Sequence, residues 1–260
     1  MSEPVRYERQ AAIGVITLDR GANRNSMTPE LLDSFARASA RAAADAEARC
    51  LVITGTGTSF SAGADFKSTL QRDGDHRAGS ERSYAMYEPF LSLLEVAVPI
   101  IGALNGHAVG GGFGLALVCD LRIGALEAKY GANFVRLGLA PGMAISYLLP
   151  RIIGLPRANE LLLTGRLVEG REAETLGILN RAVPAADVLA EAMTMARAIA
   201  EAAPLAVRAT KRAIHRGLAL QIREAAHAEA YAQAETVATD DAREGIAALL
   251  AKRPPTFTGR

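Results

Sequence analysis

The stretch Asn105-Gly106-His107-Ala108-Val109-Gly110-Gly111-Gly112-Phe113-Gly114 leads directly into the apolar run at 115–118. Glycines at the start of an apolar helix leave backbone N–H groups unshielded, and the helix N-terminus adds a partial positive charge to them. The pattern predicts a helix that begins inside the glycine cluster and offers N–H groups to an anion or a polarised oxygen. The run contains no carboxylate before Asp120, so these donors have no acid or base beside them.

Three common glycine-rich motifs do not fit this stretch. A dinucleotide fingerprint requires a third glycine where Leu115 or Leu117 stands. A phosphate loop ends in Gly-Lys-Ser/Thr, whereas the nearby pair Lys67-Ser68 follows a phenylalanine. The serine-hydrolase motif Gly-x-Ser-x-Gly fails at its first position, Ser59. Close packing of a helix on a sheet remains the structural alternative for the glycines.

A second turn of small residues, Ser59-Phe60-Ser61-Ala62-Gly63-Ala64-Asp65, follows the apolar strand predicted over 50–54. The strand predicted over 98–104 delivers the glycine cluster in the same way. Two such turns on adjacent strands would aim one N–H each at a single oxygen. The sequence therefore predicts an oxyanion hole.

A family resemblance rests on Phe60-Ser-Ala-Gly-Ala-Asp65, on Asn105-Gly with the Gly110–Gly112 run, and on Cys119-Asp120-Leu-Arg-Ile. With these motifs the chain resembles the crotonase (enoyl-CoA hydratase/isomerase) superfamily. The resemblance implies an α/β fold, the crotonase-like (ClpP/crotonase) spiral of ββα units, over 1–200. It also implies a C-terminal helical region, 201–260, that packs trimers or dimers of trimers. Three further motifs extend the resemblance over nearly the whole chain: Leu137–Gly142, Ala173–Asn180 and Glu244–Pro254.

The resemblance also implies a site. The backbone N–H groups of Ala64 and Gly111 would hold the thioester oxygen of an acyl-CoA and stabilise its enolate. CoA enters as part of the substrate, so no separate cofactor is expected. Arg24 and Lys67 would lie near the phosphates or the pantetheine, the alternative being ordinary solvated charges. The further implied contacts of the substrate are Ser61, Ala62, Asp65, Phe66, Gly110, Gly114 and Phe134, with Lys252 and Phe257 approaching the CoA of a neighbouring subunit.

The chain departs from this family at the acid/base positions. Hydratases that resemble it carry two glutamates that act together on a water molecule, and those positions hold Gly114 and Phe134 here. The carboxylate of some family isomerases would lie near Pro141 or Gly142, where no acid occurs. This departure argues against ordinary hydration.

Two classes of function follow. The first is an acyl-CoA enzyme in which decarboxylation fits well, because loss of carbon dioxide generates the enolate without a base; hydration, isomerisation and C–C hydrolysis stay open. The second is a non-catalytic fatty acyl-CoA-binding protein, in which Phe134 and Gly114 turn the reactive pocket into an apolar slot. A scaffold without a ligand is disfavoured because both oxyanion stretches keep the family pattern.

Other residues could replace the missing glutamates. His107 lies in the glycine cluster, and Tyr84 lies on a helix that the resemblance places beside the acyl pocket; a tyrosine on such a helix is more often part of the core. His76 falls in a polar segment, and His215 and His227 fall in C-terminal helices. No pair of histidines has metal-ligand spacing, so no metal is expected.

Composition agrees with a single enzyme subunit. The chain has 260 residues, half of them hydrophobic, which is enough for a large core. A net charge of +1 and the absence of tryptophan argue against nucleic-acid and membrane-surface partners. Cys50 and Cys119 each stand in an apolar run, as buried thiols do. No signal peptide or membrane-spanning run is apparent, so a cytoplasmic location is expected.

Local signals predict an alternating α/β order. Thr28-Pro29-Glu30 is a helix start with a capping threonine and an N1 proline, and the helix is expected to run to about Arg49. The polar segment 67–83 is interpreted either as a loop that closes over a pocket or as a solvated linker. The remaining predicted elements are a strand pair within 5–18, a helix over 84–94, strands over 98–104, 121–125 and 179–183, and mainly helices from 145 onward.

Overall fold

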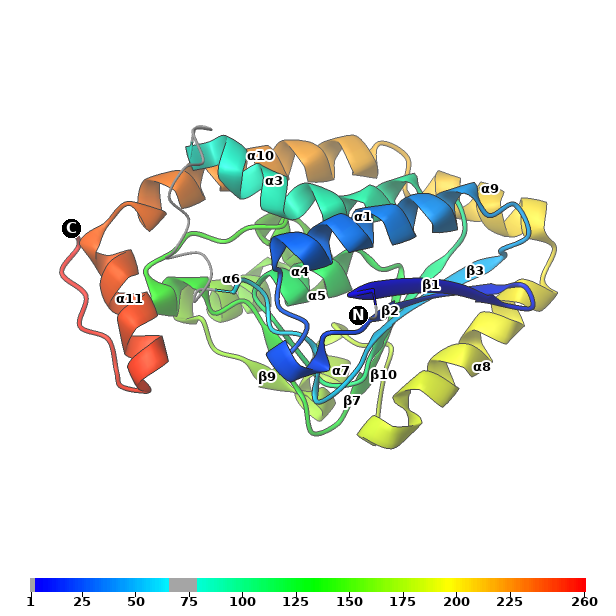
Figure 1. Ribbon diagram of the computed structural model, residues 1–260, viewed down its shortest axis with the longest axis horizontal. Helices are drawn as coiled ribbons and strands as arrows, with labels where there is room; N and C mark the ends of the chain where they lie inside the picture. Colours follow the sequence, from blue (N-terminus) through cyan, green and yellow to red (C-terminus); the bar gives the residue numbers. More distant parts are fainter. Residues whose placement is uncertain (1–2, 66–78) are drawn as a thin grey trace.

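The computed structural model describes residues 3–65 and 79–260 and has two sheets enclosed by helices (Figure 1). Residues 66–78 are not described, so most of the polar segment 67–83, interpreted as a closing loop or a solvated linker, lies outside the described residues. The larger sheet has the strand order β1-β2-β3-β5-β7-β10, with β1 antiparallel to β2 and the other pairs parallel. Its strands are β1 (Val5–Gln10), β2 (Ile13–Leu18), β3 (Cys50–Gly55), β5 (Ile100–Leu104), β7 (Leu121–Ala125) and β10 (Arg181–Val183).

In the smaller sheet, β4, β6 and β8 each follow a long strand, whereas β9 follows α6 and pairs antiparallel with β8. Its order is β4-β6-β8-β9, with β4 parallel to β6 and β6 parallel to β8. A long strand, a short strand and a helix therefore repeat along the chain, which confirms the predicted spiral of ββα units. The short strands are β4 (Ser59–Ser61), β6 (His107–Val109), β8 (Lys129–Gly131) and β9 (Val168–Glu169), and the helices of the repeat are α3 (Gly79–Leu91), α4 (Gly111–Val118) and α5 (Ile145–Ile153).

Helix α1 (Pro29–Ala44) begins as its sequence predicts. The Thr28 hydroxyl accepts a hydrogen bond from the N–H of Leu31 at 3.3 Å, and proline occupies the first turn. The helix ends at Ala44, before the predicted end, because Asp45 turns the chain and its carboxylate accepts hydrogen bonds from the Glu47 N–H and the Tyr7 hydroxyl. The strand pair within 5–18 is confirmed as the β1–β2 hairpin.

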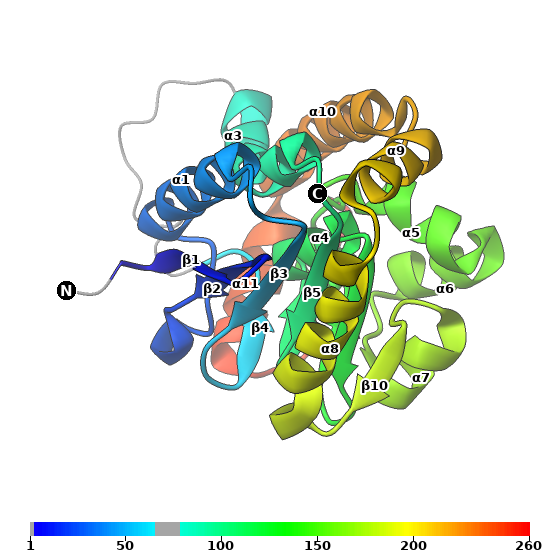
Figure 2. The same cartoon turned by 90° about the vertical axis from the view of Figure 1, so that its right-hand side faces the viewer.

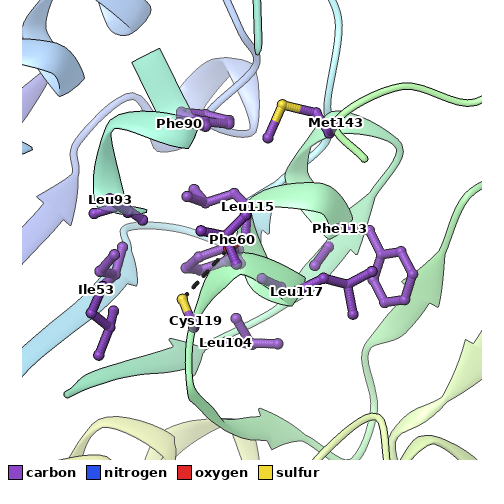
Figure 3. Close-up of a cluster of buried hydrophobic side chains, with 14 of the residues drawn as sticks. Ile53, Phe60, Phe90, Leu93, Leu104, Phe113, Leu115, Leu117, Cys119 and Met143 are labelled. Carbon is purple, nitrogen blue, oxygen red and sulfur yellow. Dashed lines mark hydrogen bonds between the residues drawn. The ribbon is translucent and has the colours of Figure 1, made fainter. Parts of the chain in front are cut away.

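Helix α4 is the centre of the core. Every residue of α4 is buried, so the helix is apolar on all sides, as a fully enclosed helix must be. Figure 3 shows side chains from β3, β4, α3 and α4 converging there, with Met143 reaching the same cluster. Both cysteines are free and buried, and burial raises the pKa of each thiol to about 12.

The C-terminal helices pack on this core. Helix α8 crosses one face of the larger sheet over β3 and β5 (Figure 2), α10 packs along α3, and α11 packs on the short helix η3 (Phe134–Leu137). No helix among residues 3–65 and 79–260 combines the length and the apolar character needed to cross a membrane. The remaining elements are η1 (Gly21–Asn23), η2 (Ser92–Glu95), η4 (Ala185–Asp187), α6 (Leu155–Thr164), α7 (Gly170–Leu176), α8 (Val188–Glu201), α9 (Pro204–Ile214), α10 (Leu218–Val237) and α11 (Asp240–Ala251).

Candidate functional site

The two small-residue turns meet at the N-terminus of α4. They follow β4 and β6, which are parallel neighbours in the smaller sheet. Gly63 and Gly110 have φ angles of +79° and +57°, which favour glycine. A Cβ placed on Gly63 would lie 2.7 Å from the carbonyl oxygen of Val109 and 3.0 Å from the nitrogen of Gly111. The peptide between Gly63 and Ala64 therefore lies directly against the first turn of α4.

The N–H groups of Ala64 and Gly111 are both without an acceptor in the described part of the chain. Ala64 forms an isolated parallel bridge with Met27, in which the N–H of Met27 donates to the carbonyl of Gly63 at 2.9 Å and the Ala64 N–H is not used. Gly111 is the first residue of α4, where the helix supplies no acceptor for an N–H. Two neighbouring donors are thus left for a ligand.

Close packing explains why this helix start needs glycine as well. A Cβ on Gly112 would lie 2.2 Å from the Ser61 carbonyl oxygen, and a Cβ on Gly111 would lie 2.3 Å from the Met27 sulfur. The structural alternative for the glycines therefore holds for the helix packing. It does not account for the two N–H groups without acceptors.

Asn25 organises the first turn and was not identified from the sequence. It is fully buried, and its amide nitrogen donates to the carbonyls of Thr56 and Ser59 at 3.1 and 2.9 Å. Its backbone carbonyl accepts from the Ser61 hydroxyl at 2.9 Å. An asparagine in a polar loop looks solvated in sequence, so only its burial distinguishes it.

The expected CoA contacts on this side lie together. The Ala62 N–H donates to the carbonyl of Arg24 at 3.0 Å, so the exposed Arg24 adjoins the turn that carries Ser61 and Asp65. Ser61 is fully buried, whereas Ala62, Ala64 and Asp65 are half-buried. Phe66 and Lys67, also expected here, lie outside the described residues.

The positions of the two missing glutamates form an apolar wall. A Cβ on Gly114 would lie 2.3 Å from the Cβ of Met143, so the fully buried Met143 occupies the space beside that glycine. The ring of Phe134 lies 3.7 Å from the Cβ position of Gly110. Gly110 is the N-cap residue of α4 and its carbonyl accepts from the Gly114 N–H at 3.0 Å, so both apolar side chains lie at the end of the helix that carries the free N–H of Gly111.

The tyrosines of α3 are engaged in contacts with α10. Tyr84 stacks on His227 with ring centroids 3.7 Å apart, while Tyr87 donates a hydrogen bond to the side-chain carbonyl of Gln233. A Cβ on Gly142 would lie 2.5 Å from the Tyr87 hydroxyl. Burial raises the pKa of Tyr87 above its ordinary value, so its proton is strongly held.

His107 lies at the exposed edge of this region. Its Nδ1 accepts a hydrogen bond from the backbone N–H of Lys129 at 2.9 Å, which joins β6 to β8. Because Nδ1 is an acceptor, neutral His107 carries its proton on Nε2. Proton transfer by His107 or Tyr84 stays a prediction.

Asp120 and Arg122 have structural partners. Asp120 accepts from the Ile100 N–H at 2.7 Å and pairs with Lys211 at 2.8 Å and with His215 at 3.1 Å. The buried Arg122 guanidinium donates to the carbonyl of Cys119 at the end of α4, and burial lowers its pKa. These contacts indicate a structural role for Asp120.

The C-terminal tail is fixed to α11. Glu244 accepts from the Arg253 guanidinium at 2.6 Å and from the Thr256 N–H at 2.9 Å, and the Arg253 bond lowers the pKa of that carboxyl to about 2. Lys252 and Phe257 are exposed on this tail. No cluster of potential metal ligands occurs among the residues that the structure describes.

The sequence and the fold resemble those of known proteins. Residues 8–260 match the sequence profile of the family described as "Enoyl-CoA hydratase/isomerase". The chain belongs to this family. A probable enoyl-CoA hydratase of Mycobacterium bovis is 35% identical over 258 residues, covering 99% of each chain. A putative enoyl-CoA hydratase of Thermus thermophilus is 37% identical over 249 residues, covering 94% of this chain and 97% of the relative.

Solved structures of enoyl-CoA hydratase/isomerase family proteins agree with this fold. A crystal structure of carnitinyl-CoA hydratase from Mycobacterium avium superimposes with a TM-score of 0.89 at 31% identity, covering 100% of both chains. The crotonase fold expected from the sequence is thereby confirmed over the whole chain. At the level of the family, the protein is an enoyl-CoA hydratase/isomerase-like enzyme of acyl-CoA metabolism.

Proposed function

We propose that this protein acts on an acyl-CoA thioester by stabilising its enolate between the N–H groups of Ala64 and Gly111, without the glutamate pair of hydratases. The observation that carries the proposal is the approach of Gly63 to the nitrogen of Gly111, 3.0 Å from the Cβ position of the glycine. Backbone donors fixed by the smaller sheet and by the start of α4 need no reorganisation when negative charge develops on the thioester oxygen.

Decarboxylation is the reaction that this site supports best. In a 2-carboxyacyl thioester, the bond from Cα to the carboxylate breaks, its electron pair forms the enolate, and carbon dioxide leaves. A proton from solvent then adds to Cα, which completes the reaction. No protein base is required, which agrees with Gly114 and Phe134 at the acid/base positions. Isomerisation and C–C hydrolysis require a proton acceptor, for which Tyr84 and His107 are the weaker candidates.

The CoA moiety is proposed to bind along the first turn. Arg24 would meet its phosphates or pantetheine, and Ser61, Ala62, Asp65 and the undescribed Phe66 and Lys67 would line the nucleotide. Lys252 and Phe257 would approach the CoA of a neighbouring subunit in a homotrimer or a dimer of trimers. Their exposure on a fixed tail supports this arrangement.

A second candidate function is acyl-CoA binding without turnover. Met143 and Phe134 favour it, because a wall without a carboxylate beside the hole has no group that delivers a proton. The candidates make the same contacts with the thioester and differ only in chemistry.

Mass spectrometry of mixed thioesters in heavy water distinguishes decarboxylation from acyl-CoA binding without turnover. The panel would contain enoyl-, 2-carboxyacyl- and β-keto-acyl-CoA, incubated with the wild-type protein. Loss of carbon dioxide from the carboxyacyl thioester, with deuterium gained at Cα, is the result expected for decarboxylation. If the thioesters bind the protein but stay unchanged, the protein binds acyl-CoA without turnover. If they neither change nor bind, both candidate functions are overturned.

A further inference from the structure

Glu229 of α10 is a buried carboxyl group that the proposed reaction does not use. It is 6% exposed, and one carboxylate oxygen, Oε1, accepts a hydrogen bond from the N–H of Ser146 at 2.7 Å and a second from the Ser146 hydroxyl. The other oxygen, Oε2, is buried and has no hydrogen-bond partner in the described part of the chain. Burial raises the pKa of Glu229, and the hydrogen bonds from Ser146 offset this only in part. Burying a carboxyl group with one oxygen left without a hydrogen-bond partner lowers the free energy of unfolding. We therefore expect Glu229 to have a specific role.

Glu229 supplies a cap that α5 lacks. The residue before α5, Ala144, has a φ of +56° and no side chain able to accept a hydrogen bond from the first turn. Glu229 accepts a hydrogen bond from the N–H of Ser146, the second residue of α5. An N-cap side chain usually accepts such a bond from its own helix, whereas here the acceptor comes from α10.

The turn that Glu229 holds is strained. Met143 and Ala144 have φ angles of +66° and +56°, and neither is glycine. Left-handed conformations of such residues persist only where surrounding contacts hold them. Two more side chains of α10 contribute: Thr236 accepts from the Ala140 N–H at 3.0 Å, and Gln233 donates to the Ala140 carbonyl at 3.2 Å.

The strained turn carries the wall of the proposed thioester site. Met143 is fully buried, and its Cβ lies 2.3 Å from the Cβ position of Gly114, on the turn of α4 that follows Gly111. Any shift of the turn would withdraw Met143 from α4 and open space beside the proposed oxyanion hole. Glu229 contacts the C-terminal part of this turn, through the N–H and hydroxyl of Ser146 and through the backbone of Ala144 and Ile145.

We infer that Glu229 is a positioning residue that sets acyl-group selectivity: through Ser146 it holds Met143 against Gly114 and so fixes the space beside the thioester. This inference rests on the proposed function, which places the thioester at Gly111. The group selected against is a branched alkyl substituent at Cα that is larger than the carboxylate of the proposed substrate, because Met143 occupies the space beside Gly114 into which it would project.

The test compares Glu229→Ala and Glu229→Gln with the matched pair Glu235→Ala and Glu235→Gln, which change an exposed glutamate of the same helix. Methionine labelled with carbon-13 at its methyl group reports on the six methionines, and Met143→Leu identifies the Met143 signal. Affinities are then measured for straight-chain acyl-CoA, α-branched acyl-CoA and free CoA.

Glu229→Ala should shift the Met143 signal and reduce the preference for the straight chain by about 10-fold, while affinity for free CoA stays the same. Glu229→Gln keeps an acceptor for Ser146 and should retain most of the preference, and both Glu235 variants should retain all of it. Met143→Ala should reproduce the loss, and Glu229→Ala should add nothing to it. If Glu229→Ala does not fold, Met143→Ala tests the same chain of contacts.

An unmoved Met143 signal, or an unchanged preference in a folded Glu229→Ala protein that binds the panel, overturns the inference alone. Failure of the wild-type protein to bind any thioester overturns the proposed function, and the role of Glu229 in selectivity falls with it.

Discussion

The two sides of the first turn of α4 differ in how they are built. On one side, the N–H groups of Ala64 and Gly111 stand free beside two glycines that pack against backbone atoms. On the other side, Met143 and Phe134 cover Gly114 and Gly110 with apolar atoms. The first side offers two fixed N–H dipoles. The side chains of Met143 and Phe134 on the second side offer neither a proton donor nor a proton acceptor.

Backbone hydrogen-bond donors and acidic side chains can therefore be lost independently of one another. The free N–H groups follow from sheet register and helix position, so a change of side chain leaves them in place and, among single substitutions, only proline removes one. A side-chain acid is lost by a single substitution, and the vacated space is filled by neighbours such as Met143. Chemistry that needs only a stabilised enolate therefore fits this protein better than chemistry that needs a pair of carboxylates.

The largest expected effect is removal of one donor. Gly111→Pro eliminates an N–H at the first helical position, where proline is tolerated, and should lower turnover of any thioester by about 10²- to 10³-fold. Gly111→Ala is the matched control, because both variants place a Cβ against the flexible Met27 side chain but alanine keeps the N–H. Equal turnover of the two variants in the heavy-water assay would contradict the oxyanion assignment.

The next effect concerns restoration of a glutamate. Gly114→Glu should lower the free energy of unfolding by about 1–3 kcal/mol, because its Cβ would lie 2.3 Å from the Met143 Cβ. Adding Met143→Gly, which removes that Cβ and suits the positive φ of this position, should recover part of that loss. Urea unfolding measures both, and a fully stable single variant would mean that the apolar wall yields more readily than its geometry indicates.

The buried carboxyl behind the wall makes stability depend on pH. The folded-state pKa of Glu229 is raised above its ordinary value of 4.5, so its contribution to stability is full below pH 4.5 and is lost as the pH rises through the raised pKa. The stability of Glu229→Gln relative to wild type should therefore increase with pH above about 4.5. Denaturant unfolding at several pH values checks the sign; a difference that shrinks as the pH rises would contradict it.

The smallest effect is expected from an apolar exchange in the wall. Phe134→Leu should cost about 1 kcal/mol of stability and leave thioester turnover nearly unchanged, because it alters neither the two N–H groups nor the charge of the site. Calorimetry and the same turnover assay measure the two quantities. A large loss of turnover would assign the ring a direct role in the chemistry.

Several features were predictable because they depend on local pattern. The start of α1, the hairpin within 5–18 and the turn into α4 follow from capping, alternation and glycine placement. Residues that act through distant contacts were missed. Asn25 and Glu229 look like ordinary polar residues in sequence, and the approach of Met143 to Gly114 joins residues 29 positions apart.

Residue type and spacing were enough to show the family motifs, the two small-residue turns and the absence of carboxylates at positions 114 and 134, and the repeating ββα order followed from the family resemblance. Only the tertiary structure decided that the turns after β4 and β6 meet, that Met143 fills the space beside Gly114, and that Glu229 holds the turn behind it. Strand pairing and helix packing bring those groups together, and neither is encoded by any one segment of the chain.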